Sequence, residues 1–132
     1  MSEPLVFELS FSAESDHVTV TGSGMLDAQG LRRIGRALLE DPRLRPGMTV
    51  LVDLADIDAS PLDNEDELFL AVGPIQERDA LAPPRAVAIV AADPATFERA
   101  ARYRAHLGGS TSKRRVFTSA ADALVWLGEQ RQ

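Results

Sequence analysis

Cysteine is absent from the 132 residues of the chain, and histidine occurs only at His17 and His106. Without cysteine there can be no disulfide framework, no thiolate nucleophile and no zinc or iron–sulfur site built on thiolates. The two histidines supply little for metal binding, and neither has a serine or an acid at a spacing typical of a catalytic triad. We therefore predict structural or solvent-exposed roles for both.

Positive charge is also scarce, because 14 Lys+Arg face 20 Asp+Glu and give a formal net charge of −6. Proteins that neutralise phosphates need a basic surface, so this balance predicts no nucleic-acid partner. The longest clean apolar run, residues 86–92, is far shorter than the ~20 residues that cross a bilayer. The acidic start, followed by an alternating stretch, is unlike a secretory signal. We expect a cytoplasmic protein without stable membrane insertion.

The remaining composition is that of a folded protein, with 45% hydrophobic and 26% charged residues. A chain of this length buries enough apolar surface to fold without a disulfide or a structural metal. We expect a single domain over residues 1–132 that needs no cofactor.

The first third of the chain contains two strand patterns and one helix pattern. Apolar residues alternate over 5–11 and again over 17–21, which predicts an antiparallel hairpin that ends at the glycines of 22–24. Asp27 can then cap a helix, and the prolines at 42 and 46 stop it.

The rest of the chain alternates between buried strands and helices. Strands are predicted over 49–54, 86–91 and 114–118, and the nearly continuous apolar runs of the first two are typical of strands covered on both faces. Helices should begin after Asn64, Asp93 and Ser119, with Pro74 kinking or ending the first and a glycine cap at 108–109 ending the second. The order β-β-α-β-α-β-α-β-α predicts an α/β fold, with a mixed five-stranded sheet that begins with an antiparallel hairpin and is flanked by helices.

Four short sequence segments, taken in their order along the chain, resemble those of a known family. They are PGMTVLVDL at 46–54, RAVAIVA at 85–91, VF at 116–117 and ALVWLG at 123–128. Together they resemble the SpoIIAA-like, STAS-related family of small bacterial domains, over residues 18–128. The resemblance implies the SpoIIAA-like fold and a non-enzymatic role in regulation through protein interaction.

Anti-sigma-factor antagonists of the wider STAS group carry a serine at a helix N-terminus whose phosphorylation switches partner binding. Here Leu62 and Asp63 stand where those serines would be, so the resemblance implies a domain without that switch. Ser60 is the nearest candidate phosphorylation site, although it precedes Pro61 and has acidic neighbours that repel a phosphate. The expected interaction surface is the loop of residues 56–64 and the helix after it. Its candidate residues are Asp56, Asp58, Ser60, Asp63, Asn64 and Asp66.

Two kinds of chemistry could use the same acidic residues. Carboxylates after a central strand could bind Mg²⁺ or Ca²⁺, but the spacing of a calcium loop is missing, and acidic residues at a helix start are ordinary. Residues 56–60 also match the Asp-x-Asp-x-Ser pattern of haloacid-dehalogenase-type phosphotransferases, which need a lysine as well, and Lys113 is the only one. We expect no metal and no catalytic residues. An enzyme that uses Asp56 and Asp58 is an alternative hypothesis.

The sequence leaves open alternative interpretations of the ligand, the partner and the basic residues. A small apolar ligand could occupy a cleft between the sheet and the helix that contains Pro74, and Trp126 is either core or a lid over a cleft. A homodimer is an alternative to a different protein partner. One basic region either docks an acidic partner, docks the acidic segment of a second copy, or is a solvated face. It comprises Arg99, Arg102, Tyr103, Arg104, His106, Lys113, Arg114 and Arg115.

Overall fold

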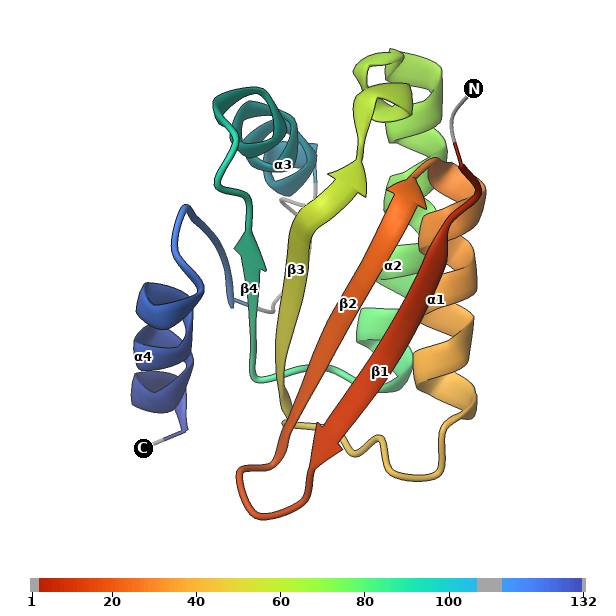
Figure 1. The fold of residues 1–132 in the computed structure, drawn as a ribbon. Coiled ribbons are helices and arrows are strands. Elements are labelled where there is room, and N and C mark those ends of the chain that lie inside the picture. Colours follow the sequence, from red (N-terminus) through yellow and green to blue (C-terminus); the bar gives the residue numbers. More distant parts are fainter. Residues whose placement is uncertain (1–2, 107–112, 132) are drawn as a thin grey trace.

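Five strands form one mixed sheet in the order β1-β2-β3-β4-β5, in a computed structural model that describes residues 3–106 and 113–131 (Figure 1). The strands are β1 (Val6–Ser12), β2 (His17–Met25), β3 (Thr49–Asp58), β4 (Ala86–Val90) and β5 (Lys113–Phe117). The helices are α1 (Ala28–Glu40), α2 (Glu65–Leu81), α3 (Pro94–His106) and α4 (Ala120–Gln130), with a short 3-10 helix η1 (Ser60–Asp63) before α2. The β1–β2 pair is antiparallel and all other pairs are parallel, which confirms the predicted α/β class and topology.

Helices cover the sheet unequally (Figure 1). The larger core lies between the sheet and α1, α2 and α3, whereas α4 packs alone on the other face over β3, β4 and β5. Strand β4 contributes to both cores, because Val87 and Ile89 point into the first and Ala88 and Val90 into the second. The prediction that this strand is covered on both faces is therefore confirmed. Among the described residues, no helix combines the length and the apolar character needed to cross a membrane.

The hairpin is confirmed, and its antiparallel pairing ends at Ser23, within the predicted residues 22–24, although β2 itself continues to Met25 beside β3. The two glycines allow the backbone of β2 to lie close to the backbone of residues 4–6. A Cβ at Gly22 would lie 2.8 Å from the backbone oxygen of Val6, and Gly24 has a φ of +95° with the backbone of Pro4 against it. A side chain at either position would collide with the neighbouring backbone, so only glycine fits at these two positions of the strand.

The predicted helix starts are confirmed by their caps. The side chain of Asp27 accepts the N–H of Gly30 at 2.8 Å, that of Asp93 accepts the N–H of Thr96 at 3.0 Å, and that of Ser119 accepts the N–H of Asp122 at 3.3 Å. The predicted glycine cap at 108–109 falls outside the described residues.

Helix α2 continues through position 74, so Pro74 does not end it, and the alternative that it kinks the helix stays a prediction. A proline removes one backbone hydrogen bond from a helix interior. On both sides of this position Ala71, Val72 and Ile75 are buried, and this packing holds the helix together despite the lost bond.

Strand β3 also extends four residues beyond the predicted end at 54. The sequence pattern did not indicate this extension, because a bulge interrupts the alternation of apolar and polar residues. Its pairing with β2 shifts, so that the single residue Gly22 lies opposite two residues of β3, Leu54 and Ala55. The bulge keeps both Leu54 and Ile57 in the larger core, although they are three positions apart. As a result Asp56 and Asp58 belong to a strand, which corrects the predicted loop of 56–64 to η1 and its flanking residues.

Candidate interaction surface and internal cavity

The six predicted surface residues lie along one continuous segment at the carboxyl end of the sheet. They are Asp56 and Asp58 on β3, Ser60 and Asp63 on η1, Asn64 before α2, and Asp66 in the first turn of α2, and all six are exposed. Open α/β sheets place their binding sites beyond the carboxyl ends of their strands. We call these six residues the acidic end.

Side chains of the acidic end hold its own backbone in place. Asp58 accepts the N–H of Ser60 at 2.9 Å, and this hydrogen bond lowers the pKa of the Asp58 carboxyl. Asn64 Oδ1 accepts the N–H groups of Asp66 at 2.9 Å and Glu67 at 3.2 Å, and so caps α2. The segment is exposed, but its conformation is specified by local hydrogen bonds.

Asp63 is engaged with α3. The Nε of Arg99 donates to Asp63 Oδ1 at 2.8 Å, and Arg102 Nη1 lies 3.9 Å from the same oxygen. The hydrogen bond from Arg99 lowers the pKa of Asp63, and the same bond raises the pKa of Arg99. We call these three residues the η1–α3 clasp. Part of the basic region thus meets an acidic residue of its own chain.

More of the basic region is used inside the molecule. Arg114 pairs with Asp79 of α2 at 2.8 Å, with only 4% and 7% of the two side chains exposed, and Arg104 Nε donates to the backbone oxygen of Arg114 at 2.7 Å. Lys113 donates to Gln130 Oε1 at 3.2 Å. Sequence analysis missed Asp79, although its spacing of four from Ile75 places it on the buried stripe of α2. The side chain of His106 falls outside the description.

Two large apolar side chains are exposed next to the acidic end. Phe69 is 76% and Leu70 is 52% exposed, so neither belongs to the core, although a large apolar side chain on this helix would be expected there. The run Leu68-Phe69-Leu70 fits more than one helical face, and in the structure Leu68 points inward together with Ala71. An exposed aromatic beside a polar rim is typical of protein interfaces.

The residues required for phosphotransfer do not come together. Lys113 begins β5 opposite Ala86, at the amino end of the parallel strands, whereas Asp56 and Asp58 lie at the carboxyl end of β3. In the described ranges, no three His, Asp or Glu side chains are grouped closely enough to hold a metal ion.

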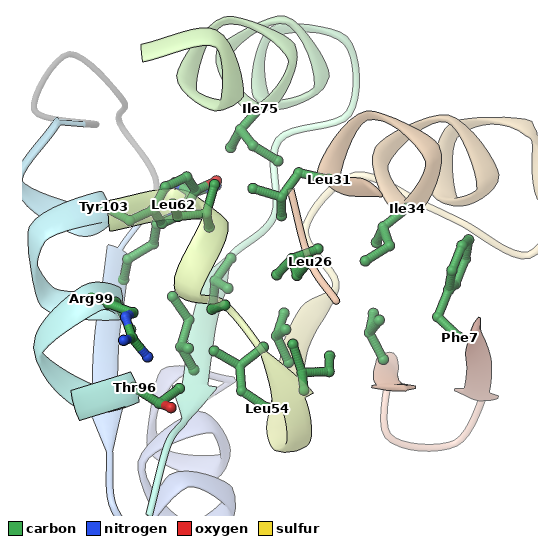
Figure 2. Close-up of a pocket in the computed structure, with 18 residues that line it drawn as sticks. Phe7, Leu26, Leu31, Ile34, Leu54, Leu62, Ile75, Thr96, Arg99 and Tyr103 are labelled. Carbon is green, nitrogen blue, oxygen red and sulfur yellow. The ribbon is translucent and has the colours of Figure 1, made fainter. Parts of the chain in front are cut away.

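A cavity of about 70 Å³ lies in the larger core (Figure 2). Figure 2 shows Phe7 and Ile34 at one end and Leu62 and Tyr103 at the other. The predicted apolar cleft therefore exists, but α1, α3 and η1 line it as well as α2. Fourteen of its lining residues are apolar, namely Phe7, Val20, Leu26, Leu31, Ile34, Val52, Leu54, Ile57, Ala59, Leu62, Ile75, Val87, Ile89 and Ala100. Trp126 is not a lid over it, because it packs against Phe117 on the opposite face of the sheet, with ring centroids 5.6 Å apart.

Four polar residues complete the wall of the cavity, and they are Thr96, Arg99, Tyr103 and Arg114. The hydroxyl of Thr96 donates to Asp93 at 3.2 Å, and each arginine is paired with an aspartate as described above. Throughout the described part of the chain, no buried side-chain nitrogen or oxygen lacks a hydrogen-bond partner. Thr96, Arg99 and Arg114 in the wall of the cavity therefore each have a polar partner within the protein.

Solved structures with the same architecture include those of two other proteins. One is an uncharacterised protein of the DUF3478 family with a SpoIIAA-like fold from Shewanella loihica PV-4, with 17% identity and a TM-score of 0.55. The other is an anti-sigma factor antagonist from Mycobacterium paratuberculosis, with 16% identity and a TM-score of 0.56. Each alignment covers 96% of this chain and 98% of the other. No family model matches the sequence, and no curated protein does so significantly. The chain has the SpoIIAA-like fold, as its sequence phrases indicated.

Proposed function

We propose that this protein is a non-enzymatic regulatory domain that binds another protein through its acidic end. The likeness in fold to an anti-sigma factor antagonist supports a regulatory role. The observation that carries the proposal is the grouping of the six exposed polar residues of the acidic end beside the exposed Phe69 and Leu70.

This surface indicates the chemistry of its partner. The carboxylates of Asp56 and Asp66 are exposed, whereas Asp63 is held by the η1–α3 clasp. Arg99 and Arg102 neutralise part of the charge near η1, which leaves the two ends of the segment as its acidic contacts. A partner with basic side chains around an apolar pocket for Phe69 complements this arrangement.

Charge reversal at the two ends tests the proposal. The tagged full chain is expressed in its own host, its bound proteins are identified, and the captured partner is then purified and titrated. The double variant Asp56→Lys/Asp66→Lys should weaken binding by at least about tenfold through like-charge repulsion, with little change in melting temperature. Asp63 is left intact, because a lysine there would face Arg99 and Arg102.

The matched control is Glu8→Lys/Glu14→Lys, which makes the same change in net charge at exposed positions of β1 and the hairpin turn. It should bind like the wild type. Equal affinity of both double variants would mean that the partner docks elsewhere, and capture of only a second copy of the chain would replace the proposal with a homodimer.

The proposal includes the absence of a phosphoserine switch. Ser60 is exposed, and its N–H is bound to the carboxylate of Asp58, so a phosphate on Ser60 would lie beside a negative charge. The intact mass of the protein isolated from its host should show no phosphate. A phosphate that maps to Ser60 and is lost in Ser60→Ala would overturn this part.

A further inference from the structure

The wall of the cavity indicates the polarity of what it can hold. Its charged side chains, Arg99 and Arg114, are already matched by Asp63 and Asp79, and the hydroxyl of Thr96 is bound to Asp93. Because the rest of the wall is almost entirely apolar, a charged or strongly polar ligand would lose more hydration than hydrogen bonds to the wall could replace. The cavity favours an uncharged, apolar occupant.

The volume of the cavity limits the size of that occupant. At about 70 Å³ it has roughly half the volume of the ~150 Å³ apolar cavity known to take benzene. A xenon atom or a molecule of a few carbon atoms fits without rearrangement, whereas a larger molecule can lie wholly inside the core only if part of the wall moves.

The part of the wall that is most easily moved is the segment around η1. Most of the wall belongs to the sheet and to helices of 13 or 17 residues, but Ala59 and Leu62 come from a four-residue 3-10 helix and the residue before it. The η1–α3 clasp, with Asp63 and Arg102 both well exposed, ties this segment to α3. Figure 2 shows Leu62 and Tyr103 at this end of the cavity.

We propose that the cavity is a binding site for a small, uncharged apolar molecule, and that a molecule larger than about 70 Å³ enters by displacing η1. Buried Leu62 and exposed Ser60 and Asp63 belong to the same short helix, so an occupant that is large enough to displace η1 also moves these residues of the acidic end. The regulatory consequence rests on the proposed function: the apolar molecule controls partner binding by repositioning these residues.

Two apolar probes of different size test the inference on the full-length protein, with no partner present. Xenon and benzene are titrated separately, and methyl and backbone amide resonances are followed by NMR. Xenon should shift the methyl resonances of Leu62 and Ile75 saturably and leave the amides of residues 60–64 unchanged. Benzene should shift the same methyl groups and also those amides.

Three variants complete the test. Ala100→Val fills the cavity from α3 and should abolish binding of both probes, with Val20→Ile as a second filling variant, whereas Ala101→Val, at an exposed neighbouring position, should bind like the wild type. Asp63→Asn removes the charge of the clasp and should raise benzene affinity roughly two- to fivefold while leaving xenon affinity unchanged.

Absence of saturable shifts with both probes, or binding that survives both filling variants, would overturn the site. Benzene shifts at α1 or α2 amides in place of η1 would overturn the displacement of η1. None of these results depends on whether the acidic end binds a protein, so failure here is distinct from failure of the proposed function.

Discussion

At the scale of single residues, His17 joins two strands. Its Nδ1 is 2.8 Å from Thr49 Oγ1 and its Nε2 is 2.9 Å from Thr19 Oγ1, while Arg131 donates to the same Thr49 oxygen at 2.7 Å. Burial lowers the pKa of His17, and the positive charge of Arg131 lowers it further. The neutral ring is therefore the form that the folded protein favours.

This low pKa predicts an acid-sensitive contribution to stability. Because the pKa of His17 is lower in the folded state, the unfolded state binds more protons once the pH falls below the ordinary value of 6.5. The contribution is present in full above that pH and is lost as the pH falls toward the folded-state pKa. Urea unfolding at several pH values between about 7.5 and 5.5 should show a smaller loss in His17→Gln than in the wild type. An unchanged slope would contradict this role.

At the scale of secondary-structure elements, α2 is tied to two distant neighbours by single acidic side chains. Glu67 Oε2 accepts the N–H of Ala28 at 3.0 Å, so α2 caps the start of α1. Further along the same helix, Asp79 pairs with Arg114 and so connects α2 to β5.

The pair of Asp79 and Arg114 should matter for stability chiefly when one partner is removed. Asp79→Ala leaves a buried guanidinium without its carboxylate and should lower the free energy of unfolding by about 3–5 kcal/mol. The double replacement Asp79→Leu/Arg114→Met removes both charges and should lose much less. Urea unfolding of the wild type and both variants measures the difference, and equal losses would contradict the argument.

The cap from Glu67 predicts a smaller effect. Glu67→Ala should lower the free energy of unfolding by about 0.5–2 kcal/mol, because the first turn of α1 loses a charged acceptor. Glu65→Ala, two positions earlier and exposed, is the control and should change it little. Thermal unfolding followed by circular dichroism distinguishes the two, and equal melting temperatures would mean that solvent replaces the cap.

Local patterns predicted the elements well and their boundaries less well. Alternation and capping residues identified all five strands and four helices, since Asp27, Asp93 and Ser119 act through neighbours three positions away. The bulge in β3 depends on pairing with Gly22, and the course of α2 past Pro74 depends on packing. The residues of the acidic end were identifiable from sequence, but the engagement of Asp63 by Arg99 needs the topology, because 36 residues separate them.

At the scale of the whole molecule, the larger core is not fully packed. A void of about 70 Å³ at ~24 cal/mol per Å³ corresponds to roughly 2 kcal/mol of unrealised stability. The filling variant Ala100→Val should therefore raise the free energy of unfolding by about 1 kcal/mol, and Ala101→Val should not. Calorimetric melting temperatures check this, and destabilisation by Ala100→Val would mean that the wall cannot adjust to two added methyl groups.

The bulge in β3 changes which positions of the strand, even-numbered or odd-numbered, face the larger core. Up to Leu54 the even-numbered positions of the strand face the larger core, and from Ile57 onward the odd-numbered positions do so. Ala55 is the one residue that changes the count. Deleting it would leave the same side chains facing inward and outward, and it would also keep the pairing of Ser23 with Asp56, so that η1 stays at the same height along the sheet. The strand therefore accommodates one residue more than its pairing with β2 requires, and the reach of the acidic end does not depend on that residue.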